Sequence, residues 1–166
     1  MTTTTWEFRR AGRPELDAIM GIESTTFGTD AWSRTTMKSE LSSTNTFYLV
    51  AADPAEPAAT AGYAGLLCPR GASQADIQTI AVAEGFRRRG LGRALMTALI
   101  TEARERGARE VFLEVRADNP GAIDLYLSLD FEELAVRKKY YQPDGVDARI
   151  MRLTIPAPRI SPAVGV

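Results

Sequence analysis

Histidine is absent from this sequence of 166 residues, and cysteine occurs only once. The absence of histidine excludes Ser-His-Asp and Cys-His catalysis and disfavours a zinc site, so we expect no bound metal. The single cysteine, Cys68, cannot form a disulfide within the chain. Its place between an apolar run and Pro69 favours a small buried hydrophobic residue over a nucleophile. Proton transfer must therefore use carboxylates, tyrosine, lysine, water or the substrate itself.

The sequence also lacks a long apolar run and a large charge of either sign. No stretch approaches the length of a membrane span, and residues 1–5 lack the charged-then-apolar layout of a secretory signal. The net charge of −1 argues against a broad electrostatic surface for nucleic acid or membrane. We therefore expect a cytoplasmic protein without either partner. Length and composition predict one domain over residues 1–155, then a disordered proline-rich tail at 156–166.

The sequence does contain alternating strand and helix patterns along most of its length. Apolar and β-branched runs predict strands at residues 6–10, 46–52, 61–67, 77–82, 110–115, 131–140 and 147–155. Helical periodicity predicts helices from about Pro14 to Phe27, after Ser33, from Arg93 to Arg106 and from Pro120. This order indicates a mixed α/β fold, in which helices cover both faces of one sheet.

A turn rich in glycine and arginine follows the strand predicted at residues 77–82. A strand that leads through such a turn into a helix presents free amides and the positive end of the helix dipole, which suits a phosphate. The Walker pattern is missing, and Leu95 stands where a dinucleotide-binding fingerprint needs a third glycine. The pattern that fits is Arg87-x-x-Gly90-x-Gly92, which resembles the acyl-CoA pyrophosphate loop of GNAT N-acetyltransferases. A plain, solvated basic turn is the alternative.

A second constellation runs from Glu114 to Tyr126. A carboxylate ends the strand at 110–115, Asn119 begins the next helix, and Tyr126 lies two turns into that helix, so the three can face one cleft. The string closely resembles the Glu-Val-Arg-x-x-Asn-x-x-Ala-x-x-Leu-Tyr segment of RimI-type protein N-terminal acetyltransferases. The resemblance covers about residues 6–155.

Two further segments carry this resemblance. Ala31-Trp32-Ser33 with Glu40-Leu41 is similar to the first loop and helix of the RimI-type enzymes. Residues 137–141, with Asp147-Ala148 and Met151, are similar to their C-terminal signature. The sequence departs from the pattern in two places. Arg88 and Arg89 make the turn unusually basic, and Val146 replaces a common acidic residue, which puts contacts with the acceptor in doubt.

The resemblance implies a GNAT fold: a central mixed, mostly antiparallel sheet in which the strands at 77–82 and 110–115 splay apart. It implies acetyl-CoA as the cosubstrate, with Glu114 as general base for the amine and Tyr126 as general acid for the departing sulfur. Asp76 is a minor candidate for the base. The implied cofactor-binding residues are Ile80, Ala81, Val82, Arg87, Arg88, Arg89, Gly90, Leu91, Gly92, Arg93 and Asn119. Trp32, Tyr140 and Tyr141 are implied to bind the acceptor.

The acceptor implied by the family is a protein N-terminus, in particular the N-terminal alanine of a ribosomal small-subunit protein. An α-amino group has a reference pKa of ~7.7–8.0, so most of it must lose a proton at neutral pH before it can attack. Two alternatives remain open at this point. The acceptor could be a lysine side chain or a small amine, or the chain could be a non-catalytic module that binds acyl-CoA.

Overall fold

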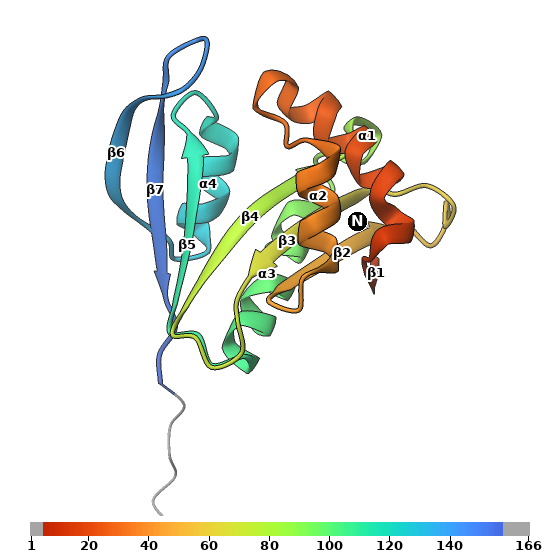
Figure 1. Ribbon diagram of the computed structural model, residues 1–166, viewed down its shortest axis with the longest axis horizontal. Helices are drawn as coiled ribbons and strands as arrows, with labels where there is room; N and C mark the ends of the chain where they lie inside the picture. The colour runs from red at the N-terminus through yellow and green to blue at the C-terminus, as the bar shows by residue number, and fades with distance from the viewer. Residues whose placement is uncertain (1–4, 158–166) are drawn as a thin grey trace, which may run out of the picture.

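The computed structural model describes residues 5–157. The chain folds into a seven-stranded sheet with helices on both faces (Figure 1). The strand order is β1-β2-β3-β4-β5-β7-β6. Only β4 and β5 pair in parallel, and the other neighbours within the described chain are antiparallel. The mixed, mostly antiparallel sheet is thus confirmed. Apart from Pro156 and Ala157, the tail expected at 156–166 lies outside the described residues.

The elements follow the predicted order. The strands are β1 (Glu7–Arg10), β2 (Thr46–Ala52), β3 (Gly62–Leu67), β4 (Gln74–Val82), β5 (Glu110–Arg116), β6 (Glu132–Tyr141) and β7 (Val146–Thr154). The helices are α1 (Leu16–Phe27), α2 (Arg34–Ser42), α3 (Leu91–Glu105) and α4 (Pro120–Ser128), with 3-10 turns η1 (Arg13–Glu15), η2 (Gly28–Asp30) and η3 (Glu84–Phe86). None of the helices within residues 5–157 has the length and apolar character that crossing a membrane requires.

Several boundaries differ from the prediction by one to three residues, and two of these differences have identifiable reasons. The helix α3 begins at Leu91 rather than at Arg93, because Gly90 adopts a left-handed conformation with φ 80° and ends the turn early. The strand β4 begins at Gln74 rather than at Ile77, because its first residues pair with β5. Sequence periodicity alone did not mark this added, partly polar stretch.

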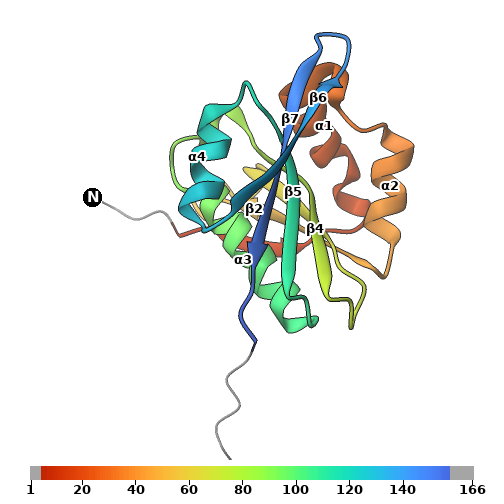
Figure 2. The same cartoon turned by 90° about the vertical axis from the view of Figure 1, so that its left-hand side faces the viewer.

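The two faces of the sheet have separate hydrophobic cores. The helices α3 and α4 cover one face, where Leu95, Met96 and Leu99 of α3 are fully buried (Figures 1 and 2). The helices α1 and α2 cover the other face and bury Ile19 and Met37. Helices on both faces were predicted from the alternation of strands and helices, and this prediction is confirmed.

The strands β4 and β5 separate after a short paired segment. Residues 74–76 pair with 110–112, and the ladder ends there. In β4 the register with β3 then shifts between Ile77 and Thr79, which leaves Gln78 as an extra residue. Such a bulge bends and twists its strand, and beyond it β4 and β5 diverge (Figure 1). The splay implied by the resemblance is therefore present.

The bulge also changes which side chains of β4 face each core. Ala75 and Ile77 contribute to the core under α3 and α4 before the bulge, and Ile80 and Val82 pack against that core after it. Because side chains alternate along a strand, one extra residue reverses the parity. Ala81 consequently joins the core under α1 and α2.

Candidate active site

The first part of the site is the turn at residues 87–93, called here the amide turn. Gly90 occupies the N-cap position of α3 and offers no side-chain cap. The first amides of a helix have no intrahelical partner, so Leu91, Gly92 and Arg93 present N–H groups at the positive end of the dipole. A Cβ at Gly92 would lie 3.3 Å from a methyl carbon of Leu125, so glycine there permits the close approach of α4. This arrangement suits an anion.

Three of the four arginine side chains around the amide turn, those of Arg87, Arg89 and Arg93, are engaged within the protein. Arg87 Nε donates to the carbonyl of Val82 at 3.0 Å. Arg89 pairs with Asp53, and its guanidinium lies 4.8 Å from the ring centroid of Trp6. Arg93 donates to Ser128 on α4 at 2.6 Å. These three side chains brace the turn. Arg88, in contrast, is exposed, with φ 62°.

The second part of the site is the strand edge that the splay leaves open. Ile80, Ala81 and Val82 pair with β3 on one side, but the pairing of β4 with β5 has ended several residues earlier. Their edge toward β5 can therefore accept an extended ligand as an additional strand. Val82 is also the last residue of β4, so this open edge leads directly to the amide turn.

The third part is a cleft of about 760 Å³ beside the splay, called here the aromatic cleft. It includes the three residues predicted to bind the acceptor, together with both candidate bases. The residues lining it are Asp30, Trp32, Gln74, Asp76, Ile77, Gln78, Phe112, Leu113, Glu114, Arg137, Tyr140, Tyr141, Gln142 and Ile150. They come from the segment before α2, from β4, β5, β6 and β7, and from the turn after β6, so the fold assembles this cleft from segments that are distant in sequence.

Glu114 lies at the surface of the aromatic cleft, with 36% of its side chain exposed. Its Oε1 is 3.6 Å from Nη1 of Arg137. Hydrogen bonding with Glu114 and the negative charge of Glu114 raise the pKa of the Tyr140 hydroxyl. The carboxylate is thus held by neighbours from β6 while part of it stays exposed to water.

Tyr126 lies on the opposite face of the sheet from Glu114. It is buried on α4 and packs against Phe131, with ring centroids 6.0 Å apart. Burial raises the pKa of Tyr126 to about 12, with a smaller contribution from Tyr141. Burial also raises the pKa of Tyr141 to about 12, and Glu114 contributes there. Tyr141 is therefore within electrostatic range of both Glu114 and Tyr126.

Glu114 lines the aromatic cleft, but Asn119 and Tyr126 are not among its lining residues, so the prediction that these three side chains face one cleft is not met there. Asn119 is the N-cap of α4, and its Oδ1 accepts from the amide of Ala122 at 3.2 Å, so this oxygen has a structural role. Asp76 lines the aromatic cleft, where partial burial and the charge of Glu114 raise the pKa of its carboxyl. Asp76 therefore remains a competing base on geometric grounds.

Several polar residues around the cleft escaped the sequence reasoning. Glu23 on α1 is 1% exposed and accepts hydrogen bonds from Tyr63, from Thr79 and from the amide of Trp32 at 3.1 Å. Its position on the apolar stripe of α1 was the only signal of burial. Arg137 stands in the quoted C-terminal segment, but no sequence pattern indicated that it would pair with Glu114.

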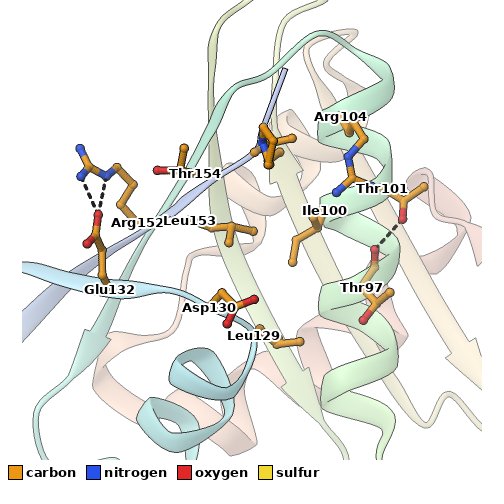
Figure 3. A pocket seen from close by; sticks show the side chains of 12 residues that line it. Thr97, Ile100, Thr101, Arg104, Leu129, Asp130, Glu132, Arg152, Leu153 and Thr154 are labelled. Carbon is orange, nitrogen blue, oxygen red and sulfur yellow. Dashed lines mark hydrogen bonds and ion pairs between the residues drawn. The ribbon is translucent and has the colours of Figure 1, made fainter. Parts of the chain in front are cut away.

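A second hollow lies on the other face of the molecule, between α3 and the end of β7 (Figure 3). It measures about 550 Å³ and contains none of the predicted site residues. Its ion pair joins Arg152 to Glu132 at 2.6 Å.

Within residues 5–157 there is no group of three side chains suited to hold a metal ion, and Cys68 is completely buried.

The splay of β4 from β5 and the helix α3, which begins after Gly90, are features of the GNAT fold. Comparisons with known proteins and structures agree with this fold. A crystal structure of the ribosomal-protein-S18-alanine N-acetyltransferase from Escherichia coli superposes with a TM-score of 0.81 at 31% identity, covering 98% of this chain and 100% of that one. The model of the Acetyltransferase (GNAT) family matches residues 16–131. The chain therefore belongs to the GNAT acetyltransferase family.

Two curated relatives are named for N-terminal acetylation. N-alpha-acetyltransferase RimI of Mycobacterium tuberculosis is 35% identical over 140 residues, which are 83% of this chain and 82% of that protein. The [Ribosomal protein bS18]-alanine N-acetyltransferase of E. coli K12 is 49% identical over 84 residues, or 49% of this chain. The matched region spans only 57% of that E. coli protein, and 38% of a relative from Mycobacterium leprae.

Proposed function

We propose that this chain transfers the acetyl group of acetyl-CoA to the α-amino group of a protein N-terminus. The observation that carries the proposal is the splay of β4 and β5, which joins the amide turn to the aromatic cleft. The names of the E. coli and M. tuberculosis relatives support an N-terminal acceptor. The preferred acceptor in this proposal is the N-terminal alanine of a ribosomal small-subunit protein.

The residues present fit acetyl-CoA at the splay. The amides of Leu91, Gly92 and Arg93 would hold the pyrophosphate, since they point from a helix N-terminus and lack intrahelical partners. The open edge of residues 80–82 would pair with the extended pantetheine arm, and one of its amides would polarise the thioester carbonyl. Acetyl-CoA itself supplies an activated acyl group with a thiol as its leaving group.

Glu114 is proposed as the general base. It lies on β5 two residues beyond the last pairing with β4, so it stands at the opening of the splay. An N-terminal amine that enters between Trp32 and the pair Tyr140 and Tyr141 would meet this carboxylate. The carboxylate would take a proton directly or through a water molecule. Removal of that proton gives the neutral amine that can attack a thioester.

Tyr126 is proposed as the donor to the departing sulfur. With a pKa of about 12 its phenol stays protonated at neutral pH. A free thiol has a pKa of ~8.5, so complete transfer from Tyr126 is uphill in this environment. The phenol would therefore donate a hydrogen bond that stabilises the thiolate, and the thiolate would take its proton from water as the product leaves.

The test is mass spectrometry after incubation with acetyl-CoA and a peptide that begins with alanine and contains one internal lysine. The expected product carries one acetyl group on the terminal nitrogen. A matched peptide with a blocked N-terminus is the control and should remain unmodified. Acetylation of the lysine in both peptides, or a preference for small amines, would instead support a different acceptor class.

The non-catalytic alternative is separated by the same experiment. A module that only binds acyl-CoA would show acetyl-CoA binding in calorimetry without acetylated product from any acceptor. The cleft carboxylate of Glu114 and the buried phenol of Tyr126 both interact electrostatically with Tyr141, a residue of the cleft, and this arrangement favours the enzyme. Glu114 and Tyr126 would have no shared task in a module that only reports ligand levels.

A further inference from the structure

Arg116, the last residue of β5, joins three acidic side chains around one end of the aromatic cleft. Its Nη1 donates to Asp30 at 2.6 Å, at the end of η2. Its Nη2 pairs with Asp144 in the turn between β6 and β7. Its Nε and Nη2 also donate to the two oxygens of Asp118 at 3.0 and 3.1 Å. One guanidinium thus connects two loops that are far apart in sequence.

The geometry of these contacts favours a fixed clamp over a loose surface pair. The two bonds to Asp118 set the plane of the guanidinium, which then directs its remaining donors. Arg116 and Asp30 have side chains that are only 23% and 18% exposed, so water and salt screen their attraction less than they screen an exposed pair. Hydrogen bonds from Arg116 lower the pKa of both Asp118 and Asp144.

The clamp also contacts the wall of the aromatic cleft. The guanidinium carbon of Arg116 lies 5.0 Å from the ring centroid of Tyr141, within the range of a cation–π interaction. Tyr141 and Asp30 both line the cleft, and Trp32 follows Asp30 by two residues. The same side chain therefore positions elements on both sides of the opening.

We propose that Arg116 is a positioning residue that holds the aromatic cleft in its acceptor-binding shape before the acceptor arrives. This inference rests on the function proposed above. A flexible peptide terminus loses conformational entropy when it binds, and a preformed cleft avoids the added cost of ordering two loops. Because all these contacts lie at the cleft, Arg116 should affect acceptor binding more than acetyl-CoA binding.

The kinetic test compares Arg116→Gln with Arg152→Gln in the full chain. Arg152 is a matched control because it also pairs with two acids, Glu132 and Glu110, but lies at the second hollow (Figure 3). We expect Arg116→Gln to raise the KM for an alanine-started peptide about tenfold, as loss of charge-assisted hydrogen bonds can do. The KM for acetyl-CoA should change by less than about twofold. Arg152→Gln should leave both values near those of the wild type.

A structural test needs no catalytic activity. Hydrogen–deuterium exchange is measured without substrates on wild type, Arg116→Gln and Arg152→Gln. Faster exchange at residues 28–33 and 142–146 in Arg116→Gln alone is the expected result. This test distinguishes the two proposals, because it holds even if no peptide is acetylated, in which case the proposed function fails and the clamp survives.

Two milder variants, Arg116→Lys and Asp144→Asn, keep the proposal falsifiable if Arg116→Gln fails to fold. Arg116→Lys retains the charge but not the planar fork, so an intermediate acceptor KM is expected. Asp144→Asn removes one of the three ion pairs of Arg116 and should raise the acceptor KM about threefold. Unchanged loop exchange in these variants would overturn the proposal. Equal rises in both KM values, or the same effects in Arg152→Gln, would also overturn it.

Discussion

The amide turn and the aromatic cleft lie at the same splay but are built in opposite ways. The amide turn is one contiguous segment, and its proposed ligand contacts are backbone amides that any sequence with the same turn could supply. The aromatic cleft is assembled from side chains of distant segments, from Asp30 to Ile150. Cofactor binding should therefore tolerate most side-chain changes, whereas acceptor chemistry should depend on individual residues.

The largest effect is expected for Glu114→Gln, which removes the proposed base from the cleft and leaves the turn intact. We expect kcat to fall about 100-fold to 1000-fold at neutral pH, in the range for loss of a general base. The acetyl-CoA dissociation constant, measured by calorimetry, should stay within about twofold. Full activity in this variant would remove Glu114 from the mechanism.

Tyr126→Phe should have the next largest effect. Loss of the buried hydroxyl is expected to lower kcat about 10-fold to 100-fold, because the departing thiolate loses a hydrogen-bond donor. Single-turnover kinetics would place the defect in the chemical step. Circular dichroism and acetyl-CoA affinity serve as controls for the fold, and a normal single-turnover rate would contradict the role of Tyr126.

Gly90→Ala tests the other side of the comparison, because it changes backbone geometry without removing a functional side chain. Alanine at φ 80° is strained, at about 1–2 kcal/mol. The turn should relax and weaken acetyl-CoA binding roughly fivefold to tenfold, equivalent to about 1–1.4 kcal/mol. Gly121→Ala is the control, since it lies in the first turn of α4, where an added Cβ meets nothing within 4 Å.

The control variant Gly121→Ala should bind acetyl-CoA with the same affinity as the wild type. Equal binding by Gly90→Ala and wild type would show that the left-handed cap is not needed for the ligand. Equal weakening by both glycine variants would point to a general loss of helix stability instead.

The smallest effect is expected for Asp76→Asn. Asp76 stands at the paired end of β4 and β5, opposite Phe112, whereas Glu114 lies about 6–7 Å farther along β5 toward the opening. We therefore expect kcat to fall less than about threefold, within the effect of a changed local charge. A loss as large as that of Glu114→Gln would move the role of base to Asp76, whose raised pKa makes it a plausible proton acceptor.

The contrast between a contiguous amide turn and an aromatic cleft assembled from distant segments explains what the sequence could and could not predict. The turn from Arg87 to Arg93 was predicted directly, because a strand, glycines and a helix start are adjacent in the chain. Glu114 and Tyr126 were selected only through the resemblance to RimI-type enzymes. Position and periodicity alone indicated only that Glu114 ends a strand and that Tyr126 lies two turns into the next helix. The structure brings Trp32, Glu114 and the tyrosine pair into one cleft.

Three features lay beyond sequence reasoning because they depend on long-range register. The bulge at Gln78 follows from the pairing of β4 with β3, which periodicity does not specify. The burial of Glu23 depends on hydrogen bonds from Tyr63 and Thr79 on neighbouring strands. The ion pair of Arg116 with Asp30 joins residues that are 86 positions apart.

The central claim is that the amide turn and the open edge of β4 hold acetyl-CoA at the splay. Hydrogen–deuterium exchange of the full chain, with and without saturating acetyl-CoA, tests it directly. The account predicts slower exchange at residues 80–93 in the presence of acetyl-CoA, with no change in β2, which lies away from the splay. Exchange at residues 80–93 that stays the same while acetyl-CoA is bound elsewhere, or not bound at all, would contradict it.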